Sequence, residues 1–211
     1  MKLLLLGATG VTGQQLVRLA LEQGHHVTVL VRSPDKLRSD DRHLRVRVGS
    51  VMDPAAAEEA TSGQEVVLIT LGSNIPREFL RPPMLMTRSL SAIVPAMQHQ
   101  RVNRVVLLSA LGVGESARLA PTLLRIASKT VLRRLANDKA AAEAHLRASG
   151  LDWTVVYSPL MADSPATGVY QSGEGLRIAG LRKISPADVA EFMLAQVGST
   201  AYSRKNVVIS P

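Results

Sequence analysis

The first 32 residues, MKLLLLGATGVTGQQLVRLALEQGHHVTVLVR, carry the strongest structural signal in the chain. Its apolar run from Leu3 to Leu6 is typical of a strand buried on both faces of a parallel sheet and is too short to cross a membrane. Three glycines follow at once, and the spacing of the apolar residues after them predicts a helix that leads into a second strand over 27–31. The stretch therefore predicts a β–α–β unit.

The turn inside this unit predicts a phosphate-binding site. Its glycines allow a tight turn, let a pyrophosphate approach the backbone and let the helix lie close to the strand, while the helix N-terminus supplies free N–H groups. Three glycines alone are a weak signal, since they could mark only a turn that starts a helix, but their place between a buried strand and a helix favours a dinucleotide site. The residues predicted to hold the dinucleotide are Gly7, Thr9, Gly10, Val11, Thr12 and Gly13.

Arg32 follows the second strand, where an NAD-specific site would place an acid on the ribose 2′-hydroxyl. A guanidinium can instead hold a 2′-phosphate through charge-assisted hydrogen bonds, helped by the hydroxyl of Ser33 beside it. In isolation a solvated arginine would be the more common explanation, but the position of Arg32 in the unit favours the phosphate contact. The sequence therefore predicts NADPH as the cofactor.

The composition of the 211 residues is typical of a single α/β domain over residues 1–211. The chain has no cysteine, which excludes a disulfide framework and a thiolate metal site and suits a reducing cytoplasm. No signal peptide or membrane-spanning stretch is evident, and the five histidines show no ligand spacing with carboxylates. We expect a cytoplasmic protein with no metal and no membrane partner.

The net charge of +8 raises the question of nucleic-acid binding, because a basic surface attracts phosphates of any sequence. The arginines are scattered, aromatic residues are only 3% of the chain, and no DNA-reading motif is present. We therefore expect no nucleic-acid partner, and a generally basic surface is the better interpretation.

Strands and helices alternate along the rest of the chain. The further predicted strands are 44–48 near the sheet edge, 65–71, 102–109, 151–157 and 206–209, with two short ones at 168–171 and 176–178. After a loop over 75–82, one helix starts at Pro82-Pro83; the others are 54–60 capped by Asp53, 121–148 as one helix, and 186–197 capped by Ser185. This order predicts a doubly wound parallel sheet with ligands beyond the carboxyl ends of its strands.

Polar and small residues follow the predicted strands at those carboxyl ends. They include Gly72, Ser109 and Ala110, and the segment at about 158–183 is rich in glycine and long enough to cover them as a substrate loop.

With these residues in place, the chain resembles the NAD(P)H-binding atypical short-chain dehydrogenase/reductases, and most closely the biliverdin-IXβ reductase/flavin reductase group, which have a Rossmann-like fold. The stretches that carry the resemblance are GATGVTG at 7–13, HVTVLVR at 26–32, LRASGLDW at 146–153, DSPATGVY at 163–170 and ISPADVAEFML at 184–194. The last two are the more specific, since the glycine motif is shared by many relatives.

This resemblance implies a monomeric reductase that holds the nicotinamide of NADPH over the Ser109 region and reduces a planar acceptor such as a flavin, a bilin or a quinone. The further cofactor contacts that it implies are Ser50, Val51, Leu71, Gly72, Ala110, Pro159 and Leu160. Ser50 stands where many relatives carry an aspartate, and Leu160 replaces a histidine found in the biliverdin reductases.

The proton-donating pair Tyr-x-x-x-Lys of many short-chain dehydrogenases is missing, because Leu135 stands four residues before Lys139. The predicted catalytic residues are Ser109, which can hydrogen-bond the carboxamide or the substrate, and Lys139, which can bind the nicotinamide ribose. The alternatives are a strand-end hydroxyl bonded to the backbone and a solvated lysine.

The sequence leaves two further alternatives open. Arg118, Arg125, Lys129 and Arg133 fall near one face of the predicted helix, where they form a solvated face or attract anionic substrates. The whole chain could also be a redox sensor that resembles the NmrA-like regulators and binds the dinucleotide without turnover.

Overall fold

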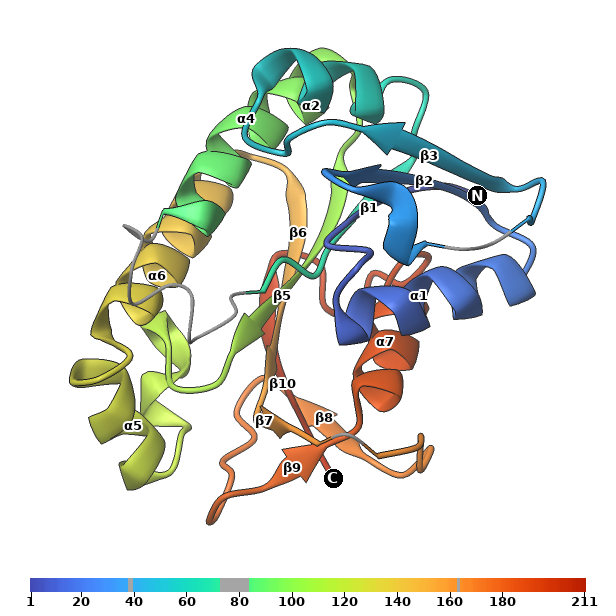
Figure 1. The fold of residues 1–211 in the computed structure, drawn as a ribbon. Coiled ribbons are helices and arrows are strands. Elements are labelled where there is room, and N and C mark those ends of the chain that lie inside the picture. Colours follow the sequence, from blue (N-terminus) through green and yellow to red (C-terminus); the bar gives the residue numbers. More distant parts are fainter. Residues whose placement is uncertain (38–39, 73–83, 163) are drawn as a thin grey trace.

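The computed structural model describes residues 1–37, 40–72, 84–162 and 164–211, and a central sheet organises them (Figure 1). In the described chain this sheet has eight strands in the order β3-β2-β1-β4-β5-β6-β10-β8. Their bounds are β1 Lys2–Leu6, β2 His26–Val31, β3 Leu44–Val48, β4 Val66–Ile69, β5 Arg104–Ala110, β6 Asp152–Ser158, β8 Gln171–Gly173 and β10 Lys205–Ser210. The strands pair in parallel except β8, which is antiparallel to β10.

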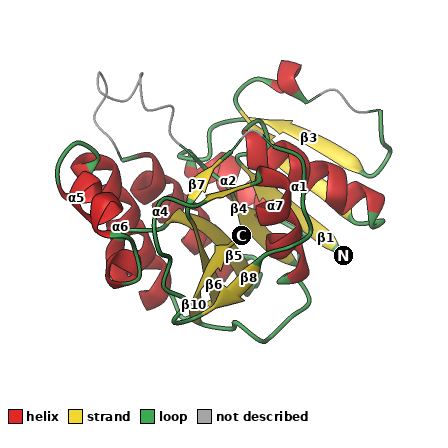
Figure 2. Cartoon of the chain, turned by 90° about the horizontal axis from the view of Figure 1, so that it is seen from below, coloured by secondary structure: helices red, strands yellow, loops and turns green. Residues whose placement is uncertain are grey.

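Helices cover both faces of the sheet. Their bounds are α1 Val11–Glu22, α2 Pro54–Thr61, α4 Leu85–His99, α5 Thr122–Lys129, α6 Arg133–Ala148 and α7 Pro186–Ala195. Side chains alternate along a strand, so Leu3 and Leu5 pack in one cluster with α1 and α7, whereas Leu4 and Leu6 pack in another with α2, α4 and α6. A view turned by 90° shows α1 and α7 together on one side and α4, α5 and α6 on the other (Figure 2).

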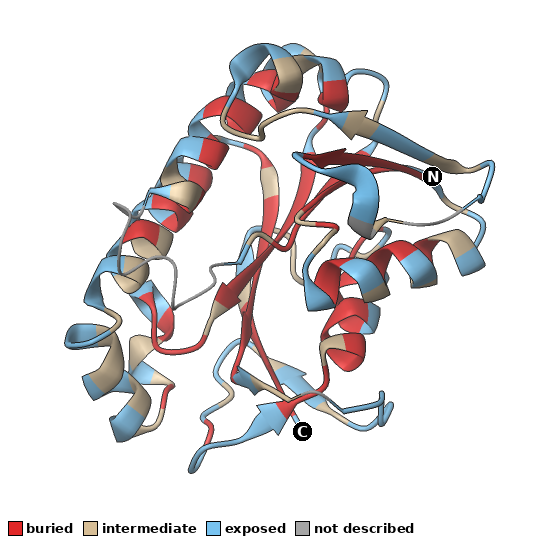
Figure 3. Cartoon of the chain, in the orientation of Figure 1, coloured by how far each residue is buried: buried red, intermediate tan, exposed pale blue. Residues whose placement is uncertain are grey.

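Burial follows this layering, with the central strands and the sheet-facing sides of the helices buried (Figure 3). The first strand is a continuous leucine run because both of its faces are covered. The edge strand β3 keeps most of its residues partly or fully exposed, which agrees with its predicted edge position. No helix in the described ranges is long and apolar enough to cross a bilayer.

Most predicted elements are confirmed. The predicted strands of the parallel sheet begin and end within two residues of the observed ones. Asp53 caps α2 by accepting a hydrogen bond from the N–H of Ala55 at 3.0 Å, and Ser185 caps α7 by accepting one from the N–H of Ala187 at 3.0 Å. In both helices a proline fills the first position, where its missing N–H costs nothing.

The predicted single helix over 121–148 is wrong, because two helices, α5 and α6, occupy this stretch. Thr130 leaves the helical region with φ −117° and ψ −97°, and its hydroxyl donates to the carbonyl of Ile126 at 2.9 Å. A β-branched side chain whose hydroxyl bonds the preceding turn gives the backbone an alternative to the helix.

The four cations that the sequence placed near one helical face lie on different elements. Arg118 lies in a short 3₁₀ turn, Arg125 and Lys129 lie on α5, and Arg133 lies on α6, so they do not share one helical face.

The two predicted short strands are also corrected. The strand expected at 168–171 is instead β8, and 176–178 forms no strand. The register of β8 is set by the pairing of Gln171 with Ser210 on β10. A separate pair of two-residue strands joins β7 Leu160–Met161 to β9 Lys183–Ile184. The loop predicted over 75–82 and the helix start at Pro82-Pro83 lie outside the described residues, and α4 begins at Leu85.

Candidate functional site

The order of the strands places the candidate site at the junction of β1 and β4. From β1 the chain builds outward through β2 and β3 to one edge, and from β4 it continues through β5 and β6 toward the other. A crevice forms at the carboxyl ends of the strands where the order reverses, and open α/β sheets bind ligands there. The sheet thus places the carboxyl ends of β1, β4, β5 and β6 next to one another.

Two glycines of the turn after β1 are required by close backbone contacts. Gly7 has φ +89°, and a Cβ at this position would lie 2.7 Å from the carbonyl carbon of Thr70, at the end of β4. A Cβ at Gly13 would lie 2.1 Å from the carbonyl oxygen of Gly7. Any side chain at Gly13 would therefore push α1 away from the turn. The close packing of helix on strand that the sequence predicts thus requires a glycine here.

The N-terminus of α1 is arranged to receive an anion. The N-cap is Gly10, and within the described chain neither a capping side chain nor an acidic residue in the first turn neutralises the N–H groups. Thr12 is buried and its hydroxyl donates to the sulfur of Met161 at 3.3 Å, which links α1 to β7. A dinucleotide pyrophosphate fits this cradle of glycines and free N–H groups.

Arg32 and Ser33 come directly after β2 and are exposed. Across the described ranges Arg32 has no hydrogen-bond or ion-pair partner, so its guanidinium is available to a ligand. Ser50 and Val51 follow β3 and are half-buried, and the hydroxyl of Ser50 accepts a hydrogen bond from the N–H of Met52 at 3.3 Å. These residues extend the site along the carboxyl edge from the glycine turn.

The other predicted contacts follow β4 and β6. Leu71 is half-buried, and Gly72 is exposed, with no atom of the described residues within 4 Å of the position that a Cβ would take. Pro159 is buried at the end of β6, and Leu160, which starts β7, is exposed. The structure therefore brings the predicted residues to one edge, while their contact with a cofactor stays a prediction.

Ser109 lies near the end of β5 and is only 3% exposed. Its hydroxyl donates to Oε1 of Glu143 on α6 at 2.5 Å, and Glu143 is fully buried. The other carboxylate oxygen, Oε2, accepts from the hydroxyl of Tyr157 at 2.6 Å and from Arg147 at 3.1 Å. A buried carboxylate with three donors thus lies directly behind the predicted catalytic serine.

Tyr157 shares in this network from β6. Arg147 donates to its hydroxyl at 3.0 Å and to Oδ1 of Asn206 at 3.1 Å. Burial, and next the charge of Glu143, raise the pKa of Tyr157 above its ordinary value of 10.0. The phenol therefore remains a proton donor to the carboxylate at neutral pH.

Sequence reasoning did not single out Glu143. The signal available was its position one turn after Lys139 on a helix, between the buried Ala142 and Leu146, which places an acid on an apolar face. Lys139 is half-buried on the same side of α6, and Ala110, also half-buried, ends β5 beside Ser109. Both predicted catalytic residues thus lie close to Glu143, one through a hydrogen bond and the other along the helix.

Asp188, which the sequence reasoning also missed, anchors the predicted substrate loop. It lies in the first turn of α7, is 2% exposed, and accepts from the N–H groups of Thr167 and Gly168, both at 2.9 Å. The hydroxyl of Thr167 adds a bond to Asp188 at 3.0 Å. Thr167 and Gly168 are therefore fixed to α7 within an exposed stretch over 164–169, and the rest of the loop is held by the pairing of β7 with β9 and of β8 with β10.

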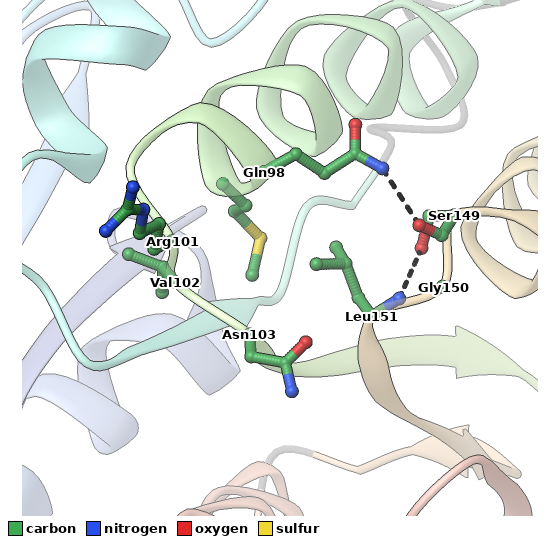
Figure 4. A pocket seen from close by; sticks show the side chains of 8 residues that line it. Gln98, Arg101, Val102, Asn103, Ser149, Gly150 and Leu151 are labelled. Atoms are coloured by element: carbon green, nitrogen blue, oxygen red, sulfur yellow. Dashed lines mark hydrogen bonds between the residues drawn. The ribbon is translucent and has the colours of Figure 1, made fainter.

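A hollow of about 380 Å³ lies at the opposite end of the sheet, near the starts of β5 and β6 (Figure 4). Gln98 bridges it by donating to the carbonyl of Ser149 at 2.8 Å, and the N–H of Leu151 donates to the hydroxyl of Ser149 at 3.2 Å. Because it lies at the amino ends of the strands, it is separate from the candidate site. Among the residues that the structure describes, no cluster of three or more metal-ligating side chains occurs.

The chain belongs to the family described as NAD(P)H-binding, whose model matches residues 7–200. This match confirms the prediction of a nicotinamide dinucleotide cofactor. The matched range includes the glycine turn, Arg32, Ser109, Glu143 and Asp188.

Similar curated proteins are distant. Oxidoreductase stcQ of Emericella nidulans is 29% identical over 173 residues, which are 70% of this chain and 60% of that protein. An uncharacterized chloroplastic protein of Arabidopsis thaliana, At2g34460, is 25% identical over 211 residues, 94% of this chain and 74% of that protein. This chain thus spans less than two thirds of the length of stcQ.

Solved structures confirm the fold. A short-chain dehydrogenase/reductase from Veillonella parvula in complex with NADP superposes with a TM-score of 0.84 at 20% identity, covering 100% of this chain and 94% of that one. ChuY of Escherichia coli O157:H7, described as an anaerobillin reductase, gives a TM-score of 0.81 at 20% identity, covering 100% and 97%. The predicted Rossmann-like, doubly wound α/β fold is therefore confirmed, and both solved structures share it.

Proposed function

We propose that this chain is an NADPH-dependent reductase that delivers a hydride to a planar acceptor, namely a flavin, a linear tetrapyrrole or a quinone. The observation that carries the proposal is the pairing of an open anion cradle at α1 with Ser109 near the end of β5, both on the carboxyl edge of the sheet. A dinucleotide that lays its pyrophosphate on the cradle can extend its nicotinamide end toward β5. The biliverdin/flavin reductase resemblance supports the same acceptor class.

NADPH supplies the hydride when it is bound, so the protein needs to orient the reactants and exclude water. Ser109 is suited to orient the nicotinamide, because its side chain is held by Glu143. Residues 164–170, anchored by Asp188, are suited to cover the acceptor. Orientation alone contributes several kcal/mol to such a reaction.

The residues on α6 argue against carbonyl reduction by acid catalysis. Leu135, one turn before Lys139, has no proton to give to a developing alkoxide. A flavin, bilin or quinone accepts a hydride readily into a conjugated system. The names of two similar proteins, an oxidoreductase and an anaerobillin reductase, support reduction and a tetrapyrrole-like acceptor.

The charge at the end of β2 supports NADPH over NADH. Arg32 is exposed and available where the ribose 2′-position is expected, and a guanidinium binds a phosphate by two charge-assisted hydrogen bonds. The NADP bound in the Veillonella structure is consistent with this choice.

One screen tests the proposal. NADPH oxidation is followed by absorbance with FMN, FAD, riboflavin, biliverdin and quinones as acceptors, and we expect saturable turnover with at least one of them. The proposal is wrong if NADPH binds, none of these acceptors is reduced, and binding instead changes the affinity for a protein or nucleic-acid partner. That result would favour the sensor hypothesis.

A further inference from the structure

We propose that Glu143 fixes Ser109 as a hydrogen-bond acceptor toward the candidate site, so that Ser109 selects the carboxamide N–H of the bound nicotinamide. Glu143 is then a positioning residue, which acts through Ser109 and not by touching the ligand. The inference rests on the proposed function in one respect, namely the position of the nicotinamide beside Ser109.

The single hydroxyl proton of Ser109 is already used. It is donated to Oε1 of Glu143 at 2.5 Å, a short bond of the kind that a carboxylate forms with a hydroxyl. A serine hydroxyl has one proton and two lone pairs. With the proton directed at Glu143, the lone pairs are what Ser109 can offer to a ligand.

Turning this proton away would be costly. Among the described residues Ser109 is the one donor to Oε1, whereas Tyr157 and Arg147 both donate to Oε2. Because Glu143 is fully buried, a rotated Ser109 would leave a carboxylate oxygen without a donor. The hydroxyl of Ser109 is therefore held in one orientation, because any other orientation would leave Oε1 of Glu143 without a hydrogen-bond donor.

The surroundings of Glu143 keep the acid itself in place. Tyr157 and Arg147 hold Oε2, and Arg147 lies 5.6 Å from the ring centre of Trp153. The backbone passes so close on another side that a Cβ at Gly114 would lie 2.8 Å from Oε2. The carboxylate cannot swing away without breaking these contacts.

An acceptor at Ser109 discriminates between ligand groups. The carboxamide of nicotinamide carries N–H donors that can meet a lone pair of the serine oxygen. A ring that carries a methyl ketone in place of the amide has a carbonyl oxygen and no N–H, so it finds no matching partner at Ser109. The orientation that Glu143 imposes on the Ser109 hydroxyl thus leads to a preference for a cofactor with a carboxamide over one with a methyl ketone.

Replacing the acid by its amide reverses this polarity without changing the shape. In Glu143→Gln the amide oxygen is needed by the donors Tyr157 and Arg147, so the NH₂ group turns toward Ser109. Ser109 then accepts from the amide, and its own proton is released toward the site. A carbonyl of either cofactor form can now be bound.

The test compares the binding of NADP⁺ with that of its acetylpyridine analogue, in which a methyl group replaces the amide NH₂. We expect the unmodified protein to bind NADP⁺ about three- to tenfold more tightly, the range of one hydrogen bond. Glu143→Gln should remove this preference while it retains binding of both forms. Calorimetric titration measures the dissociation constants without any turnover.

Glu115→Gln is the matched control, because it makes the same acid-to-amide change at an exposed neighbouring acid that contacts Arg147 and Asn206, and it leaves the bond from Ser109 to Oε1 intact. It should keep the preference for NADP⁺, and a melting temperature for each variant separates loss of folding from loss of selectivity. Equal binding of the two forms by the unmodified protein, or an unchanged preference in Glu143→Gln, would overturn the inference. A protein that reduces no acceptor but shows the predicted binding pattern would instead contradict the proposed function alone.

Discussion

At the scale of single residues, we expect Arg32 to determine which form of the cofactor binds. Arg32→Ala should remove most of a preference for NADPH over NADH of roughly tenfold or more, because a charge-assisted pair to the 2′-phosphate is lost. Since Arg32 is exposed, the preference should also shrink as salt is added. Dissociation constants for both cofactors measure the effect, and Arg88→Ala, an exposed arginine on α4, serves as the control. Equal constants in the unmodified protein would contradict the assignment.

Ser109 also contributes to folding, because it satisfies a buried acid. Ser109→Ala should lower the free energy of unfolding by about 1–3 kcal/mol, the cost of a buried acceptor left without its donor. It should also lower turnover more than NADPH binding. Urea unfolding compared with Ser172→Ala, an exposed serine on β8, tests the stability effect. A stability equal to that of the unmodified protein would mean that the bond to Glu143 contributes little.

Tyr157 gives the same network a pH signature. Its pKa is raised in the folded protein, mainly by burial, so the folded state keeps a proton that the unfolded state loses above the ordinary value of 10.0. The stability contributed by this proton is complete below that pH and is lost as the pH rises above it. Tyr157→Phe should therefore flatten the alkaline fall in unfolding free energy, whereas Tyr170→Phe should change it less, since Tyr170 is only partly buried. Parallel slopes for all three proteins would contradict this.

At the scale of the elements, α5 is the helix least supported by the core. None of its residues is buried, and Leu123 and Ile126 are 58% and 54% exposed, whereas α6 buries Ala142, Glu143 and Leu146. Local opening is easiest where few apolar side chains are buried. The amides of α5 should exchange with deuterium before those of α6 in one experiment, so that α6 is the internal control. Equal protection would show that α5 is held by contacts that its burial does not reveal.

Asp188 is expected to govern the substrate loop. Asp188→Ala removes the acceptor of the Thr167 and Gly168 amides, so these amides should exchange faster and turnover should fall while NADPH affinity stays the same. Glu191→Ala removes an exposed acid of the same helix and should change neither property. Unchanged turnover in Asp188→Ala would mean that this anchor is structural only.

The elements also show what the sequence could predict. The leucine run of β1, the capped starts of α2 and α7 and the required Gly13 carry their signals within a few residues, so the sheet, the cofactor turn and the fold class were predictable. The break between α5 and α6 falls at Thr130, whose backbone leaves the helical region without a glycine or proline to mark it, and β8 depends on pairing with β10. Glu143 and Asp188 act through partners 34 and 21 residues away, which local spacing does not reveal.

At the scale of the whole molecule, the first and last parts of the chain form one packing unit. Helix α1 packs against α7, and β1 joins through β4 and β5 to β6, which carries Trp153. The single tryptophan is buried there, far along the chain from the glycine turn. Its fluorescence should therefore report unfolding of the half of the chain that does not contain the cofactor cradle.

NADP⁺ should raise the midpoint temperature of a single unfolding transition that the whole chain shares. A ligand that binds only the folded state stabilises every part of the chain that unfolds together with its site. At a concentration 100 times the dissociation constant the gain is about 2.7 kcal/mol, which corresponds to a rise of roughly 5–10 °C in melting temperature for a chain of this size. Tryptophan fluorescence and far-ultraviolet circular dichroism should give the same midpoint, and both should shift together. Gly13→Ala, in which the new Cβ meets the Gly7 carbonyl, should lose the shift, and Gly198→Ala, at a glycine without a positive φ and with no described atom near its Cβ position, controls for substitution alone. Two separate midpoints, with only one raised by NADP⁺, would show that the sheet does not couple the cradle to β6.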